Sequence, residues 1–313
     1  DIAVSYVGFN GLIDELDEIP DNYLSGDQVS GGMMDGVSVD GLNSGPLAGF
    51  RNRIINGDFR IAQRGASFPT PSAPDSETLD RWGASYLAAA GIALTISRME
   101  FAAGQTDVPG EPEFYFRWNQ TTAGSASELY PFQRIEGVRT FAGQECTLTF
   151  WARADAARDV TPRWRQNFGG GGSADLSAGL PVCSLTTEWQ KFTRTFTPAG
   201  IAGKTINPGN YLAIELLLPT GTTMRIDIAN MPLEPGAVST PFEQRPFGTE
   251  LALCQRYYCA LSKSGSAWAV SPTDIVASII FPVEMRTSPS VMLVDTTPNF
   301  NDYNVALAGG PSA

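Results

Sequence analysis

The stretch Cys146-Thr-Leu-Thr-Phe-Trp-Ala152 carries the pattern that decides the fold class of this 313-residue chain. Successive side chains of a β-strand point to opposite faces, so Cys146, Leu148, Phe150 and Ala152 share one face. A strand with one apolar face is typical of an antiparallel sheet that packs that face on a core. We therefore expect this stretch to be a strand of a layered β protein.

The same alternation of apolar positions recurs on both sides of that stretch. It occurs at Ile92, Leu94 and Ile96; at Phe114, Phe116 and Trp118; at Leu212, Ile214, Leu216 and Leu218; and at Met224, Ile226 and Ile228. The 32 glycines and 22 prolines supply turns between such runs. The pattern predicts an all-β fold, an antiparallel β-sandwich of the jelly-roll type over residues 51–246.

Residues 1–50 differ from this body, because they hold nine acidic residues and no lysine or arginine. A helical periodicity runs through Phe9, Leu12, Ile13, Leu16 and Ile19, and Pro20 would end it. We expect an extended acidic anchoring arm with one short helix, which is either simply solvated or docked on another protein. An acidic arm disfavours nucleic acid as a partner, since phosphates need clustered basic residues.

The chain after residue 246 is predicted to contain a connecting helix over 247–260 and a small distal β segment over 261–313. Thr249 would cap the helix, and Leu251, Cys254 and Tyr258 would share the face that packs on its neighbours. Phe281–Pro289 would form a strand and its exit turn. A segment of this size is small for an independent core, so we expect it to rest on the sandwich or on neighbouring copies.

The sequence lacks the residues that several classes of chemistry require. The chain has no histidine, which excludes a Ser-His-Asp triad and a histidine metal site, and its four cysteines lack zinc-ligand spacing. A disulfide from Cys254 or Cys259 stays open. Glu111 and Glu113 lie in a Pro/Gly-rich turn and are expected to be solvated, so we expect no enzyme, although a carboxylate-based glycan hydrolase is a third alternative. No apolar run is long enough to insert in a membrane.

Aromatic residues are the best candidates for binding, because sugar rings stack on flat apolar faces. Tyr115 and Arg117 point away from the predicted core face of their strand. Trp164, followed by Arg165 and a glycine-rich loop, is the tryptophan that we expect to be most exposed. We therefore predict Tyr115, Arg117, Trp164 and Arg165 as ligand-binding residues, with structural or intersubunit packing as the alternative for Trp164.

Four phrases in a fixed order carry a resemblance to a known family. They are Asn52-Arg-Ile-Ile-Asn-Gly-Asp-Phe59, Gly143-Gln-Glu-Cys-Thr-Leu-Thr-Phe-Trp-Ala-Arg-Ala154, Leu185-Thr-Thr-Glu-Trp-Gln-Lys-Phe192 and Arg225-Ile-Asp-Ile-Ala-Asn-Met-Pro-Leu-Glu-Pro-Gly236. The chain from Arg51 to Arg245 thereby resembles the carbohydrate-binding jelly rolls of the family 4/9 type.

Further phrases look more like bacteriophage tail-fibre and related virion proteins. They are Asp80-Arg-Trp82, Thr240-Pro-Phe-Glu-Gln-Arg-Pro-Phe-Gly248, Ala252-Leu-Cys-Gln-Arg-Tyr-Tyr258 and Phe281-Pro-Val-Glu-Met-Arg-Thr-Ser-Pro289. The resemblance implies a trimeric virion protein of the tail, a fibre or tip, that attaches to a host surface glycan. Tail or baseplate proteins would bind the arm, and the distal segment would run on beyond Ala313. The alternative is a stand-alone polysaccharide-binding module without a virion role.

Sugar-binding modules of this type often hold a structural Ca²⁺, with a carboxylate after the first-strand Phe and an Asp pair in the last strand. Here Arg60 follows Phe59 and Ile228 follows Asp227, so the sequence departs from that pattern. We expect no cofactor, and a calcium site at Asp58 or Asp227 is not favoured.

Overall fold

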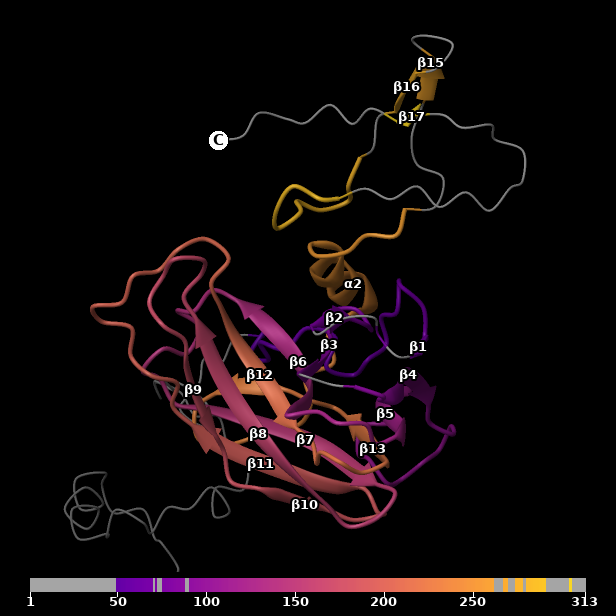
Figure 1. The fold of residues 1–313 in the computed structure, drawn as a ribbon, viewed down its shortest axis with the longest axis vertical. Coiled ribbons are helices and arrows are strands. Elements are labelled where there is room, and N and C mark those ends of the chain that lie inside the picture. The colour runs from indigo at the N-terminus through magenta and orange to yellow at the C-terminus, as the bar shows by residue number, and fades with distance from the viewer. Residues whose placement is uncertain are drawn as a thin grey trace, which may run out of the picture. The chain divides into compact units, whose positions relative to one another are not determined.

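The computed structural model describes residues 49–69, 71, 75–87, 90–261, 267–269, 274–277, 280–290 and 304–305. The acidic arm with its helical pattern at Phe9–Ile19 lies outside these ranges, so its predicted structure stays a prediction. The described residues between 49 and 246 form a sandwich of two antiparallel sheets (Figure 1).

The first sheet has the strand order β1-β4-β5-β13-β7-β11, and β14 also pairs with β7. The bounds are β1 (Ser67–Pro69), β4 (Ala93–Glu100), β5 (Phe114–Thr122), β7 (Cys146–Ala154), β11 (Gln190–Phe196), β13 (Met224–Ala229) and β14 (Leu233–Pro235). Strand β7 therefore holds β11 along one edge and β13 and β14 along the other.

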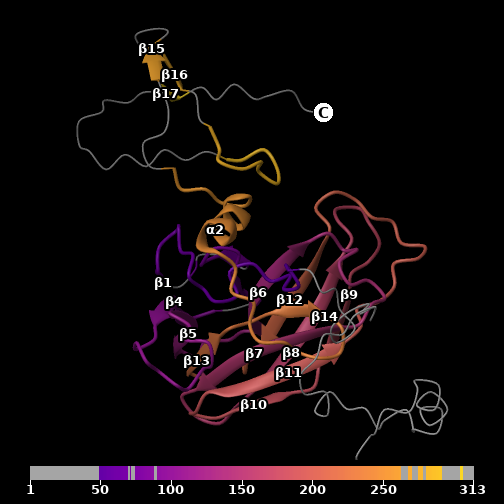
Figure 2. The same cartoon turned by 180° about the vertical axis from the view of Figure 1, so that it is seen from behind.

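The second sheet has the order β10-β8-β12-β6-β3-β2, and β9 also pairs with β8. Its strands β6, β8, β9, β10 and β12 are labelled in Figure 2. Its strands are β2 (Ser76–Glu77), β3 (Gly83–Leu87), β6 (Glu128–Glu136), β8 (Arg158–Asn167), β9 (Leu176–Gly179), β10 (Cys183–Leu185) and β12 (Tyr211–Leu217). All of its strand pairs are antiparallel. The predicted all-β antiparallel sandwich is confirmed.

The core between the sheets consists of the side chains that the alternation predicted to face inward. On β7, Cys146, Leu148, Phe150 and Ala152 are buried, and so are Leu212, Ile214 and Leu216 on β12. Phe59, Trp82 and Phe116 form an aromatic centre, in which the Phe59 and Trp82 rings lie 5.1 Å apart. Trp82 Nε1 donates a hydrogen bond to the Asn56 carbonyl at 2.9 Å, so the indole is buried without an unpaired donor.

The segment 52–58, which precedes β1, is fixed by side-chain hydrogen bonds because it is not part of either sheet. Asn52 Oδ1 accepts from the backbone N–H groups of Ile54 at 2.9 Å and Leu233 at 3.0 Å. Asn56 bonds both backbone groups of Ile61 and the Asp80 carbonyl, each at 2.9 Å. Asn56 also has a positive φ of 58°, a conformation that asparagine tolerates better than most residues.

A buried ion pair ties this segment to the chain that follows the sandwich. Arg245 and Glu250 are 6% and 3% exposed, and their side chains meet at 3.1 Å. Arg245 also donates to the carbonyls of Asn52 and Ile54, and Glu250 accepts from the Asn56 N–H. The pair therefore saturates backbone groups that neither sheet could satisfy.

Glu250 lies on helix α2 (Phe247–Gln255), which covers most of the predicted connecting helix 247–260. The expectation that Thr249 caps this helix is wrong. Pro246 occupies the cap position without a side-chain hydrogen bond, and its carbonyl accepts from the Thr249 and Glu250 N–H groups. Cys254 is buried as predicted, whereas Leu251 and Tyr258 are half-buried, and Tyr258 lies beyond the helix end.

The described part of the distal segment contains a small three-stranded sheet and a contact with the end of the helix. Strands β15 (Ala267–Ala269) and β16 (Asp274–Ala277) pair antiparallel, and β17 (Asn304–Val305) joins β16 in parallel. Phe281–Pro289 is not a strand, which corrects that expectation. Its Arg286 N–H instead donates to the Arg256 carbonyl at 2.9 Å, so this stretch folds back on the helix end.

Replacing Glu250 by alanine should destabilise the sandwich by about 3–5 kcal/mol, because it leaves the Arg245 charge buried without its partner. Urea unfolding followed by tryptophan fluorescence measures this. The control is Asp155→Ala, which removes an exposed partner of Arg158 and should cost about 1 kcal/mol or less. Equal losses in the two variants would contradict the role of the buried pair.

Candidate functional site

The outer face of the first sheet carries a cluster of aromatic side chains. Tyr115 on β5 lies 4.7 Å from Phe101 and 5.5 Å from Trp189, measured between ring centres. Trp151 on β7 packs against the same cluster, which also includes the buried Val108 and Ala229. An apolar cluster on the outer face of a sheet is unusual for a solvated surface and often indicates a binding site.

Three charged side chains beside the cluster form one ion-pair network, in which Asp227 is shared by two arginines. Asp227 on β13 accepts from Arg117 at 2.7 and 2.8 Å and from Arg153 at 3.0 Å. Arg117 Nη2 also donates to the Tyr115 hydroxyl at 3.1 Å, and the Arg153 guanidinium lies over the Trp189 ring at 4.9 Å. The network fixes the aromatic rings in place, so it supports the face more than it offers free charges.

Next to this cluster the same face is hollowed by a pocket of about 480 Å³, which we call the outer-face pocket. Its wall on the sheet consists of Thr149 and Trp151 from β7 and Lys191 from β11, all of which point outward in the strand register. Segments that follow β13 and β14 close it with Asn230 and Phe242, and Asp58 lines it from the first segment.

Two polar atoms in this pocket lack a protein partner. Thr149 is 4% exposed and Asn230 5% exposed, yet Thr149 Oγ1 and Asn230 Oδ1 make no hydrogen bond within the described part of the chain. Burying such groups unpaired costs about 1–3 kcal/mol each. Asn230 also adopts a φ of 44°, in the sparsely populated left-handed region, where strain often accompanies a functional role.

Asp58 is the one carboxylate among the residues that line the pocket. Burial raises the pKa of Asp58, Arg60 at 3.0 Å lowers it, and the nearby charge of Glu250 raises it further. Burial dominates, so the net pKa shift is upward. The Lys191 ammonium on the opposite wall donates to Ser239 Oγ at 2.9 Å.

The four residues predicted from the sequence are not brought together. Tyr115 and Arg117 lie on the outer face of the first sheet, beside the outer-face pocket, but Tyr115 is only 6% exposed and Arg117 is held by Asp227. Trp164 and Arg165 are on β8 in the other sheet. The expected exposure of Trp164 is wrong: the residue is 8% exposed and its side chain belongs to the core, because it alternates with the outward Arg163 and Arg165.

The outer face of the second sheet is closed by ion pairs of its own. Glu215 on β12 contacts Arg163 at 2.5 Å and Arg165 at 2.9 Å, and Arg163 also binds Glu128 at 3.0 Å. The Arg163 guanidinium covers the Tyr130 ring at 5.2 Å. Arg165 therefore has a partner within the protein.

Sequence reasoning missed Thr149, Trp151, Asn230 and Phe242 as site residues. The alternation in 146–152 contained the signal for the first two, since it places them opposite the core face of β7. No such signal existed for Asn230 and Phe242, because both follow the ends of strands and reach the pocket only through the folded path of the chain.

The described residues contain no cluster of side chains suited to bind a metal ion and no disulfide. There, no group of three or more His, Cys, Asp or Glu side chains could hold a metal ion, and Asp58 and Asp227 each contact arginine. All four cysteines are free thiols; burial raises the pKa of Cys146 to about 12 and also raises that of Cys254. None of the described helices has the length and hydropathy of a membrane span.

No family model matches the chain, and no curated protein does. A CBM4 structure is 20% identical and covers 57% of this chain and 97% of its own length, with a TM-score of 0.37. The CBM22-2 xylan-binding domain of Paenibacillus barcinonensis Xyn10C is 12% identical, covering 54% of this chain and 98% of its own, with a TM-score of 0.34.

A bacteriophage protein is also among the similar structures. The enzymatically active domain of tailspike protein 4 from bacteriophage CBA120 is 14% identical, covers 61% of this chain and 22% of its own, and has a TM-score of 0.36. At these identities and TM-scores the likenesses support no inference about ligand or partner.

Asp58→Asn keeps the shape of the pocket and removes its carboxylate charge. Because burial raises the pKa of Asp58 in the folded state, the wild type loses stability as the pH rises through that pKa. We expect the variant to unfold at higher temperature than the wild type at pH 7, with the difference shrinking toward pH 3, below the ordinary aspartate pKa of about 4. Thermal unfolding at several pH values measures this, and a difference independent of pH would contradict it.

Proposed function

We propose that this chain binds glycan through the outer-face pocket, as a host-attachment part of a bacteriophage tail. The observation that carries the binding proposal is the position of Trp151 beside the unpartnered Thr149 Oγ1 and Asn230 Oδ1. Sugars combine apolar ring faces with hydroxyl groups, so they complement an indole that has buried hydrogen-bonding atoms next to it.

Thr149 Oγ1 and Asn230 Oδ1 are buried in the free protein, so a sugar hydroxyl would reach them through a small shift of the pocket wall. Asn230 Oδ1 can only accept, whereas Thr149 Oγ1 can donate or accept. The Lys191 ammonium has three donor hydrogens and uses one on Ser239, so further donors remain for a ligand oxygen. A bound sugar would thereby remove the cost of leaving Thr149 and Asn230 unpaired, and this gain would appear as affinity.

The same lining favours binding over hydrolysis. Glycoside hydrolysis by the usual route needs two carboxyl groups on either side of the scissile bond. Among the residues that line this pocket only Asp58 has one, and its nearest charged neighbour is Arg60. Glu111 and Glu113, the carboxylate pair considered from the sequence, are exposed and do not line it.

The virion part of the proposal is supported by the sequence phrases that resemble tail-fibre proteins and by the contacts that two of these phrases make. The stretch 252–258 and the stretch 281–289 contact each other through Arg286 and Arg256, and both approach Glu136 at the end of β6. They behave as a joint between the sandwich and the distal segment. A homotrimer in the tail, with the arm bound to other tail proteins, completes the proposal; a stand-alone polysaccharide-binding module is the alternative.

The replacement Trp151→Ala should weaken glycan binding about tenfold or more, because it removes the stacking surface. A glycan array of bacterial surface polysaccharides and plant β-glycans identifies a ligand, and calorimetry measures its affinity for each variant. The matched control is Trp189→Ala, which removes a ring from the same face without touching the lining of the pocket. It should leave the affinity unchanged.

Three outcomes would count against the proposal. Binding that survives in Trp151→Ala would move the site elsewhere, and new reducing ends after incubation with the bound glycan would indicate an enzyme. A monomer in light scattering that binds sugar but does not compete with phage for adsorption to host cells would favour the stand-alone module.

A further inference from the structure

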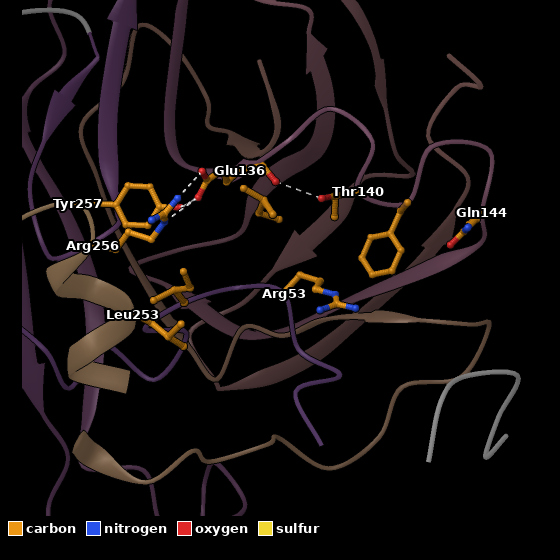
Figure 3. Close-up of a pocket in the computed structure, with 10 residues that line it drawn as sticks. Arg53, Glu136, Thr140, Gln144, Leu253, Arg256 and Tyr257 are labelled. Carbon is orange, nitrogen blue, oxygen red and sulfur yellow. Dashed lines mark hydrogen bonds and ion pairs between the residues drawn. The ribbon is translucent and has the colours of Figure 1, made fainter. Parts of the chain in front are cut away.

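A second pocket, which we call the joint pocket, lies where helix α2 meets the sandwich (Figure 3). It has a volume of about 430 Å³. Its apolar lining includes Ile55 from the first segment, Ile135 from β6 and Leu253 from α2, and Arg53, Thr140 and Gln144 add polar groups. It shares no lining residue with the outer-face pocket.

Of the charged side chains that line the joint pocket, some have a partner and one does not among the described residues. Glu136 accepts from Arg256 at 2.8 and 3.0 Å and from the Tyr257 hydroxyl at 3.0 Å, and the hydrogen bond from Arg256 is the main reason that the pKa of Glu136 is lowered. Arg53 is exposed, and its guanidinium makes no hydrogen bond or ion pair with the described residues. In Figure 3 Arg53 extends away from the Glu136–Arg256 pair, which leaves its charge free for a ligand.

The backbone of Arg53 is nevertheless fixed, and its side chain lies near one aromatic ring. Its backbone N–H donates to the Leu233 carbonyl at 2.8 Å, and its guanidinium carbon lies 6.0 Å from the centre of the Phe141 ring. A cation held beside an apolar pocket complements a carboxylate that sits beside an apolar group. Because arginine binds carboxylates through two parallel hydrogen bonds, this arrangement selects for an anion and for its orientation.

We propose that the joint pocket binds an acidic peptide segment of a protein partner, with an aliphatic side chain in the pocket and a neighbouring carboxylate on Arg53. The lining favours peptide over sugar, since sugars need an open aromatic face. Of the two aromatic residues of the pocket, Phe141 is only 6% exposed, and the Tyr257 ring is covered by the Arg81 guanidinium at 3.4 Å. Thr140 and Gln144 at the rim can bond the peptide backbone. A peptide bound here would contact the sandwich and helix α2 at the same time.

The test uses the full chain and a fluorescein-labelled eight-residue peptide of alternating leucine and aspartate, followed by fluorescence anisotropy. Arg53→Ala should weaken binding about tenfold, as expected when one charge-assisted contact is lost. Arg53 makes no side-chain contact that the fold needs, so the variant should unfold at the wild-type temperature. Leu253→Ala, which suits a helix, should weaken binding as well.

Two matched controls sharpen the test. Arg139→Ala removes an exposed arginine from the same turn as Thr140 but outside the pocket lining, and it should bind the peptide as the wild type does. A peptide with asparagine in place of aspartate should bind poorly to every variant. Absence of peptide binding to the wild type, or equal binding by Arg53→Ala and the wild type, would overturn the proposal. An oligosaccharide of uronic acids that displaces the peptide with higher affinity would overturn the assignment to a protein partner.

Discussion

The buried pair of Arg245 and Glu250 is the interaction on which both candidate sites depend. It bonds the carbonyls of Asn52 and Ile54 and the N–H of Asn56, so it fixes a segment that belongs to no sheet. Arg53 and Ile55 of that segment line the joint pocket, and Asp58, a few residues later, lines the outer-face pocket. A buried ion pair contributes little net stability by itself. Here, however, it positions the segment whose residues line part of both pockets.

Both sheets bury one face in the core, but their outer faces differ. Alternation places Cys146, Leu148 and Phe150 inside and Thr149 and Trp151 outside on the same strand. On the outer face, Asp227 and two arginines hold the aromatic cluster beside the pocket, while the opposite sheet saturates its outward charges with one another. On the outer face of the first sheet, Trp151 thereby lines the same pocket as Thr149 and Asn230, whose Oγ1 and Oδ1 atoms are buried without a partner in the described part of the chain.

The sequence alone predicted the sandwich and most of its inward faces, because a period of two over several residues is a strong local signal. It placed Tyr115 and Arg117 on the face of their strand away from the core, where the structure has them, but it did not predict the pocket beside them. Trp164 was misjudged because its flanking arginines suggested exposure, whereas strand alternation buries the residue between two outward ones. The prediction that Thr249 caps the helix was wrong because Pro246 occupies the cap position and the helix begins at Phe247. Asn230 and Phe242 reach the pocket through tertiary contacts that no local pattern encodes.

The proposed glycan site lies on the outer face of the first sheet, with the sugar at Trp151. A crystal structure of the protein with a bound oligosaccharide would show whether this is so. We expect a sugar ring stacked on Trp151, with hydroxyl groups within hydrogen-bond distance of Thr149 Oγ1 and Asn230 Oδ1. A sugar found instead on the outer face of the second sheet, beside Tyr130 and Arg163, would contradict it.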